Sequence, residues 1–281
     1  MDWIQAVVLA LVQGITEFLP ISSSGHLVLV PIVFGWPDQG LVFDIAANTG
    51  TLLAVMTYLR RDLYACTCGW WRSVQQRRLG DDPDARMAWM LILATIPVGL
   101  AGLATQDMVE TVARHPLVIG TTSILFALVL WWADARGARN RDLTQLSWRD
   151  ALVIGLFQAV ALIPGTSRSG ITMTGGLFLG LDRMASARFS FLLAVPVSVL
   201  AALLDVGELF TNPQLAQQWP ALLVVFLGSG LTAFAVINWL MAWLRHQSMF
   251  VFVIYRIILG VVIFWLAFSH GFGDNPALSG P

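Results

Sequence analysis

Six long apolar stretches divide the chain, at residues 42–59, 87–105, 117–133, 189–205, 221–243 and 249–268. A helix needs about 20 apolar residues to cross the hydrocarbon core of a bilayer, and each stretch comes close to that length. The pattern therefore predicts six transmembrane helices.

Two further apolar regions, 3–34 and 151–181, are each interrupted near the middle by Pro, Gly and Ser. The unbroken pieces, such as 27–34 and 171–181, are too short to cross a membrane. A break at membrane depth is tolerated only where it is buried in protein or lines a water-filled cavity. We therefore predict an all-α integral membrane protein with six transmembrane helices plus two re-entrant helical hairpins.

The arginines are distributed unevenly among the polar segments. Segments 60–86 and 134–150 carry ten of them, whereas segment 206–220 and the tail after Phe268 carry none. The positive-inside rule places arginine-rich loops in the cytoplasm. The six spans then alternate without contradiction, and the first hairpin opens to the outside.

Each half of the chain shows the same order, a hairpin followed by three spans. Three spans change the side of the membrane, so the second half enters from the opposite side. Residues 1–133 and 150–268 are thus predicted to form an inverted-topology repeat, an architecture typical of secondary transporters, whose sites lie at broken helices. The two halves also echo each other in sequence, since a Gln precedes each break, at Gln13 and Gln158.

Composition supports the membrane assignment and excludes one class of partner. Of the 281 residues, 57% are hydrophobic and 12% are charged, about half the charged fraction of soluble domains. The formal net charge of −1 gives no basic footprint for nucleic acid. Cys66 and Cys68, in a segment expected to be a polar loop, are predicted to be free thiols. No cleavable signal peptide is expected, because the first basic residue is Arg60.

The first break contains a carboxylate in an apolar region. Glu17 is costly inside a membrane, so it is a candidate functional residue. Gln13 lies four residues earlier, on the same face of a helix. Both side chains offer oxygen ligands, which suit a hard divalent cation such as Mg²⁺ or Ca²⁺.

Small polar residues and a histidine follow Glu17. The hydroxyls and backbone N–H groups of this stretch can form an anion-binding nest, at Ser22, Ser23, Ser24 and Gly25. His26 is the one histidine that lies within an apolar region.

The second break has a similar composition and adds a cation, at Thr166, Ser167, Arg168, Ser169 and Gly170. The planar guanidinium of Arg168 fits phosphate oxygens. Carboxylate, hydroxyl, imidazole and guanidinium together can perform phosphoryl transfer.

Each feature also has a purely structural interpretation. The serines could serve merely to form hydrogen bonds with backbone groups at the breaks. His26 could be a core residue, and Glu17 and Arg168 could form a buried ion pair. Asp44 and Arg256, two further intramembrane charges, are expected to pair structurally or to support the site. The coincidence of four reactive residue types at two matching breaks favours a functional site.

Two long motifs resemble a known family. Residues 13–26, QGITEFLPISSSGH, and residues 164–170, PGTSRSG, are similar to the signatures of bacterial undecaprenyl pyrophosphate phosphatases of the bacitracin-resistance type. Residues 190–196 and 255–260 also resemble family stretches. The resemblance implies hydrolysis of undecaprenyl pyrophosphate to undecaprenyl phosphate and inorganic phosphate. That reaction recycles the lipid carrier of cell-wall synthesis, gives bacitracin resistance, and takes place in the bacterial inner membrane at the periplasmic face.

The resemblance also implies roles for individual residues. Glu17 would be the essential acid, as a metal ligand or a proton-transfer group, and Arg168 would bind the pyrophosphate. Ser23 would be the nucleophile and His26 the base, or His26 the rival nucleophile. Gln13 stands first in a Glu/Gln-x-x-x-Glu pattern, where Gln removes one negative charge and puts in doubt any mechanism that needs two carboxylates.

Two other classes of function compete with a phosphatase. An inverted repeat could equally build a transporter or flippase of a lipid phosphate or another anion, and a scaffold protein is the third reading. Ser23 and His26 beside Glu17 favour the enzyme, because a carrier needs neither a nucleophile nor a base. The sequence leaves open whether two chains form a homodimer.

Overall fold

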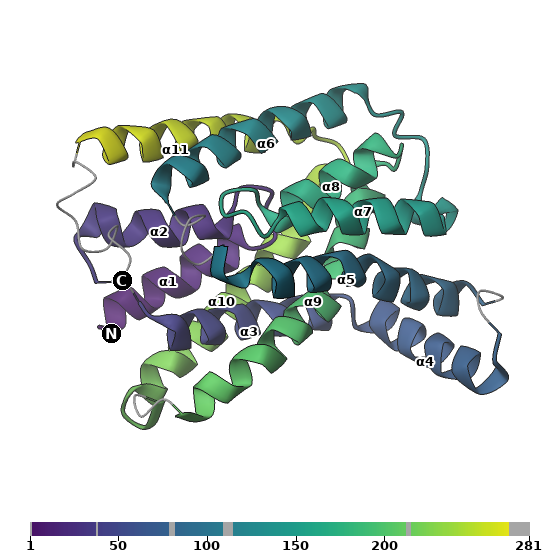
Figure 1. Cartoon of the computed structure of the whole chain (residues 1–281), viewed down its shortest axis with the longest axis horizontal. Coiled ribbons are helices and arrows are strands. Elements are labelled where there is room, and N and C mark those ends of the chain that lie inside the picture. Colours follow the sequence, from purple (N-terminus) through teal and green to yellow (C-terminus); the bar gives the residue numbers. More distant parts are fainter. Residues whose placement is uncertain (1, 38, 79–81, 109–114, 212–214, 270–281) are drawn as a thin grey trace.

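The chain folds into a bundle of helices (Figure 1). The computed structural model describes residues 2–37, 39–78, 82–108, 115–211 and 215–269. Within them the helices are α1 (Trp3–Thr16), α2 (Ser23–Phe34), α3 (Leu41–Tyr58), α4 (Arg60–Gln76), α5 (Pro83–Met108), α6 (Pro116–Arg136), the short 3-10 helix η2 (Leu143–Gln145), α7 (Trp148–Val160), α8 (Arg168–Phe178), α9 (Arg183–Thr211), α10 (Leu215–Leu244) and α11 (Phe250–Ser269).

Six of the described helices are long and apolar enough to cross a membrane. The spans are Leu41–Tyr58, Pro83–Thr105, Pro116–Arg136, Arg183–Leu203, Gln218–Leu244 and Phe250–Ser269. These confirm all six predicted spans. Large apolar side chains such as Leu103, Leu231 and Trp265 are mostly exposed on them, as expected of a surface that faces lipid rather than water. The chain is a multi-pass membrane protein.

The remaining apolar helices are too short to cross. Helices α1, α2, α7 and α8 have 14, 12, 13 and 11 residues, against about 20 for a span. α1 and α2 lie beside each other, joined by residues 17–22, and residues 161–167 join α7 to α8 (Figure 1). The predicted interruptions are therefore real breaks between helices.

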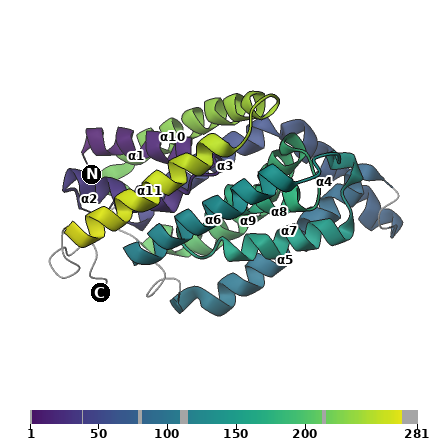
Figure 2. The same cartoon turned by 90° about the horizontal axis from the view of Figure 1, so that it is seen from above.

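The helices pack in pairs around a buried centre. α10 lies against α3 and α1, α6 against α11, and α5 against α7, as Figures 1 and 2 show. α8 packs against α6, α7 and α9, and all nine of its residues from Ser169 to Leu177 are buried. The second break therefore opens directly into the core of the bundle.

Glycines allow the closest of these contacts. A Cβ atom on Gly50 of α3 would overlap the carbonyl oxygen of Phe226 in α10. A Cβ on Gly14 of α1 would lie 2.6 Å from the Cβ of Thr232, also in α10. Small residues let helix backbones approach in this way in membrane proteins, where packing rather than the hydrophobic effect holds helices together.

Segment 60–86 is not the polar loop that we expected. It contains α4, which begins directly after Leu59 at the end of α3. Cys66, Gly69 and Ser73 form the buried stripe of α4, and their spacing of three and four residues is helical. The high polarity of the segment hid this pattern. Both cysteines are free, as predicted.

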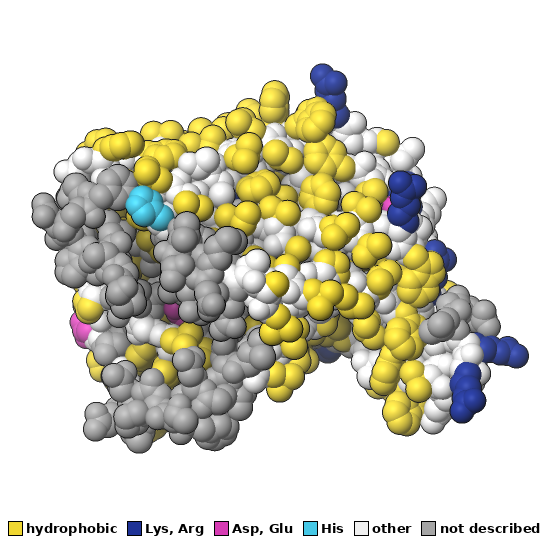
Figure 3. Space-filling view, viewed as in Figure 1, with side chains coloured by type: hydrophobic (Ala, Val, Ile, Leu, Met, Phe, Trp, Pro, Cys, Tyr) yellow, Lys and Arg dark blue, Asp and Glu magenta, His cyan; other side chains and the backbone are white. Residues whose placement is uncertain are grey.

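The basic side chains mark one end of the molecule. On the face shown in Figure 3, arginines gather at the end where α4 lies, and the surface between the two ends is mainly hydrophobic. This asymmetry is the one that the positive-inside rule uses to orient membrane proteins.

Candidate active site

The two breaks have the same local structure. Ser22 and Ser167 each precede a helix with a positive φ, 73° and 69°, which is uncommon for residues other than glycine. Each Oγ accepts a hydrogen bond from the backbone N–H three residues later, at Gly25 and Gly170. Such strained positions cluster at functional sites.

Hydrogen bonds also join the two breaks directly. Ser24 Oγ accepts a hydrogen bond from Gly165 N at 3.2 Å, and Ser169 Oγ donates to the Leu19 carbonyl at 2.9 Å. These bonds place Ser23 and Arg168, which occupy matching positions after the two N-caps, next to the same carboxylate.

Glu17 is that carboxylate. Its Oε1 accepts a hydrogen bond from Arg168 Nη2 at 2.7 Å, and its Oε2 accepts from Ser23 Oγ at 2.9 Å and from Gln13 Nε2 at 3.0 Å. The Glu17 and Arg168 side chains are only 15% and 19% exposed. The ion pair considered from the sequence is therefore present, and it includes a serine hydroxyl.

A cavity of about 170 Å³ opens onto this pair. Glu17 and Arg168 line it together with Asn48 and Thr49 of α3 and Ser198 of α9. The other lining side chains are apolar, from Ile45, Leu52, Val197, Ala201 and Ala202. The cavity thus combines a charged, hydrogen-bonding part with walls that suit a hydrocarbon chain.

Asn48 and Ser198 were missed by the sequence analysis. Asn48 Oδ1 accepts a hydrogen bond from Gln13 Nε2 at 2.6 Å, and Ser198 Oγ accepts one from Arg168 Nη1 at 3.5 Å. The available signal was a polar side chain inside an apolar span. It is weak for Ser198, because serine often bonds to its own helix backbone.

His26 lies apart from this group. Its Nδ1 is 2.7 Å from the Ser22 carbonyl and its Nε2 is 2.6 Å from the hydroxyl of Tyr255 in α11. The two rings are stacked, with centroids 5.5 Å apart. The structure brings Glu17, Ser23 and Arg168 together, and within its described part it shows no hydrogen bond from His26 to any of them.

Arg256 of α11 binds the backbone of the second break. Its side chain is fully buried, and its Nη2 donates to the carbonyls of Gly165 at 2.9 Å and Thr166 at 2.8 Å. This geometry fits the expected supporting role. Asp44 lies in the first turn of α3, where its Oδ1 accepts from Gln39 Nε2 at 3.0 Å.

The donors near Glu17 fit a divalent cation only in part. Among the described residues no cluster of three or more His, Cys, Asp or Glu could hold a metal ion. Gln13 Oε1, however, is buried without a hydrogen-bond partner in the described structure, one helical turn from Glu17. Mg²⁺ typically takes one or two carboxylates and completes its shell with water and substrate phosphates, so Gln13 and Glu17 are adequate ligands for an ion that arrives with a phosphate.

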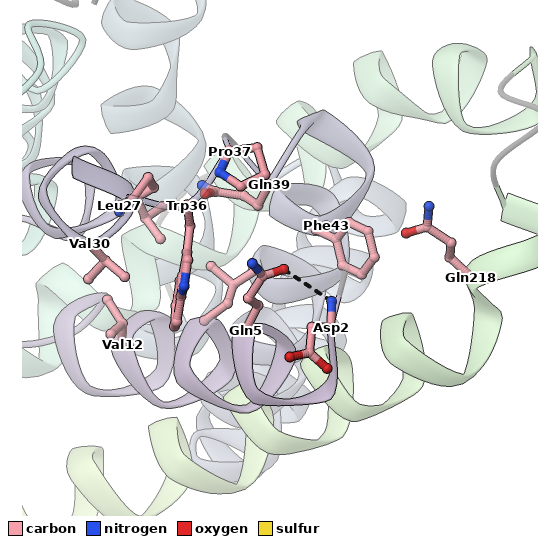
Figure 4. Close-up of a pocket in the computed structure, with 12 residues that line it drawn as sticks. Asp2, Gln5, Val12, Leu27, Val30, Trp36, Pro37, Gln39, Phe43 and Gln218 are labelled. Carbon is pink, nitrogen blue, oxygen red and sulfur yellow. Dashed lines mark hydrogen bonds between the residues drawn. The ribbon is translucent and has the colours of Figure 1, made fainter. Parts of the chain in front are cut away.

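A second cavity, of about 300 Å³, lies between α1, α2 and the start of α3. Figure 4 shows Trp36 between the side chains of the two helices, with Gln5 accepting a hydrogen bond from the Asp2 backbone N–H. Its lining contains none of the predicted site residues.

These features define a class, a multi-pass membrane protein whose acid, serine and arginine meet where two helical breaks interlock. Comparison with known proteins then gives the family. The model of the family "Bacitracin resistance protein BacA" matches residues 6–262, and the chain belongs to this family.

Curated relatives match along almost their whole length. A protein of Magnetococcus marinus named undecaprenyl-diphosphatase is 58% identical over 266 residues, which cover 94% of this chain and 98% of the relative. Undecaprenyl-diphosphatase 2 of Stutzerimonas stutzeri is 49% identical over 267 residues, 94% and 97% of the two chains. The undecaprenyl-diphosphatase of Alcanivorax borkumensis is 49% identical over 268 residues, 95% and 100%.

Proposed function

We propose that this protein hydrolyses undecaprenyl pyrophosphate to undecaprenyl phosphate and inorganic phosphate. The observation that carries the proposal is the contact of one carboxylate, Glu17, with both the Ser23 hydroxyl and the Arg168 guanidinium beside a cavity with apolar walls. The relatives named undecaprenyl-diphosphatase support the choice of substrate and do not favour the transporter alternative.

The substrate has two chemically different parts, and the cavity has a place for each. The pyrophosphate would bind Arg168, whose guanidinium has further N–H donors besides the one given to Glu17. The polyprenyl chain would extend from the cavity between α3 and α9, along Ile45, Val197 and Ala201. The low polarity of these walls would strengthen each charged contact to phosphate.

In the first chemical step, Ser23 Oγ attacks the terminal phosphorus, and Glu17 accepts the hydroxyl proton across the 2.9 Å hydrogen bond. The bond from the terminal phosphorus to the bridging oxygen breaks, and undecaprenyl phosphate leaves with that oxygen. Water then attacks the phosphoserine, the bond from phosphorus to Ser23 Oγ breaks, and Glu17 returns its proton to that oxygen. Inorganic phosphate leaves with the oxygen and both protons of the water. Arg168 stabilises the charge on the transferring group, as arginines do in other phosphoryl transfers.

The site would also use a divalent cation, Mg²⁺ or Ca²⁺, held by Gln13 and Glu17. Bound there, the ion would neutralise negative charge on the pyrophosphate. The unpartnered oxygen of Gln13 supports this assignment.

The membrane arrangement forms part of the proposal. The helix pairs α1–α2 and α7–α8 are assigned as re-entrant hairpins of an inverted repeat, residues 1–133 and 150–268. The matching serine caps and the interlocked breaks support this arrangement. The arginine-rich end would face the cytoplasm of a bacterial inner membrane. The first hairpin would then open toward the periplasm, and substrate would reach the active site from that side.

The test is release of phosphate from undecaprenyl pyrophosphate by the purified protein, with and without EDTA. We expect metal-dependent release by the wild type and by Thr57→Val, a control in α3 that lies outside the cavity. Glu17→Gln should lose nearly all activity. A folded wild type that releases no phosphate would exclude the phosphatase and return the choice to a transporter.

A further inference from the structure

A third cavity, of about 580 Å³, lies at the arginine-rich end of the molecule. It forms where the end of α3 meets the start of α4, the first turns of α9 and the end of α10. Four arginines and one acid line it, Arg60, Arg61, Arg188, Arg245 and Asp62. None of these residues belongs to the site around Glu17.

The single acid is already paired. Asp62 Oδ1 accepts a hydrogen bond from Arg188 Nη2 at 2.6 Å. Arg60 Nη1 donates to the Thr57 carbonyl at 3.1 Å. Within the described residues, the side chains of Arg61 and Arg245 form neither a hydrogen bond nor an ion pair. Three positive charges in one hollow are therefore not balanced by a carboxylate.

The base of the cavity is apolar. Leu59 and Met241, which line it, are only 3% and 6% exposed. Both lie at ends of membrane-spanning helices, so the cavity lies at the level where lipid headgroups meet the protein. Arg136 and Arg149, two exposed arginines near the same end of the molecule, line neither this cavity nor the two described above.

We propose that this cavity binds the phosphate group of an anionic lipid at the surface of the membrane. Guanidinium groups bind phosphate oxygens through paired N–H donors. Basic pockets between transmembrane helices on the cytoplasmic side bind lipid headgroups in other proteins. The apolar base would accept the first carbons of the lipid chain. A phospholipid and a polyprenyl phosphate both offer this phosphate chemistry.

The experiment is native mass spectrometry of the full chain in detergent, titrated separately with phosphatidylglycerol, phosphatidylcholine and undecaprenyl phosphate. The variant Arg61→Gln/Arg245→Gln removes the two unpaired arginines and leaves the Asp62–Arg188 bridge intact. The control Arg136→Gln/Arg149→Gln removes the same charge from exposed positions of the same end. Thermal melting and phosphate release check that both variants fold.

We expect the wild type and the control to bind an anionic lipid more tightly than phosphatidylcholine. The cavity variant should bind that lipid roughly ten- to thirtyfold more weakly, from the contribution of each arginine near a membrane surface. If the cavity variant loses affinity only for phosphatidylglycerol, the cavity is a phospholipid site. If it loses affinity only for undecaprenyl phosphate, the cavity is a second site for the product. Equal affinities of the cavity variant and the control for both anionic lipids would overturn the proposal.

Discussion

Glu17 Oε1 accepts a hydrogen bond from Arg168 Nη2 at 2.7 Å, although 151 positions separate the two residues in the chain. Each residue stands at a break between two short helices, and the breaks come from opposite halves of the protein. Neither half therefore holds a complete site, and the bonds that join the two breaks hold the acid and the arginine in contact.

The packing of α3 against α10 gives a stability prediction. Gly50→Ala should lower the free energy of unfolding by about 1–3 kcal/mol, because the new methyl group would overlap the Phe226 carbonyl. Gly99→Ala is the matched control, since its Cβ would meet only Leu200 Cδ2 at 3.6 Å. Thermal unfolding in detergent measures both. Equal melting temperatures for the two variants would contradict the close contact.

Asn48 should matter for activity although it lies within a membrane span. Asn48→Ala leaves Gln13 Nε2 bonded to Glu17 alone, and we expect kcat/KM to fall about tenfold, as for the loss of one hydrogen bond. Thr57→Val is the control, because Thr57 lies in the same helix outside the cavity and its Oγ1 donates only to the Leu53 carbonyl of that helix. A wild-type rate in Asn48→Ala would show that Gln13 needs no anchor.

His26 and Tyr255 should act as a unit. Tyr255→Phe removes the hydroxyl 2.6 Å from His26 Nε2, and kcat/KM should fall about three- to tenfold. In His26→Ala that contact is already lost, so adding Tyr255→Phe should cost almost nothing more. A double-mutant cycle of kcat/KM measures this coupling. If the fold decreases in kcat/KM of the two single variants multiply in the double variant, the two side chains act independently.

The two cysteines should differ in reactivity. Burial, together with the nearby carboxylates of Asp84, Asp62 and Asp82, raises the pKa of the Cys66 thiol to about 11. Because the thiolate is the nucleophile, Cys66 should stay protonated and unreactive toward a maleimide from pH 7 to 9. Cys68 is partly exposed and should be labelled. Mass spectrometry of the Cys66→Ser and Cys68→Ser variants after maleimide treatment measures the labelling of each cysteine separately. Rapid labelling of Cys66 at pH 7 would contradict its burial.

Hydropathy alone located the six spans and both breaks, because length and apolarity are strong local signals. It failed at α4, where the polarity of the segment concealed the buried stripe of Cys66, Gly69 and Ser73. The two sequence motifs predicted Glu17, Ser23 and Arg168 as site residues, and in the structure Glu17 accepts hydrogen bonds from the other two. Asn48 carried a signal that was overlooked, a polar side chain inside an apolar span, but its bond to Gln13 and the partnership of His26 with Tyr255 could not be found from the sequence, because each contact joins residues that are distant in the chain.

The contact between Ser23 and Glu17 is tested most directly by phosphate release from undecaprenyl pyrophosphate. The proteins compared are the wild type, Ser23→Ala, Glu17→Gln and the double variant, each shown to be folded. If Glu17 accepts the proton of an attacking Ser23, each single variant should lose about 10²- to 10⁴-fold in kcat/KM, and the double variant should lose little more than the worse single one. A Ser23→Ala protein that releases phosphate at the wild-type rate would contradict the assignment of Ser23 as the nucleophile.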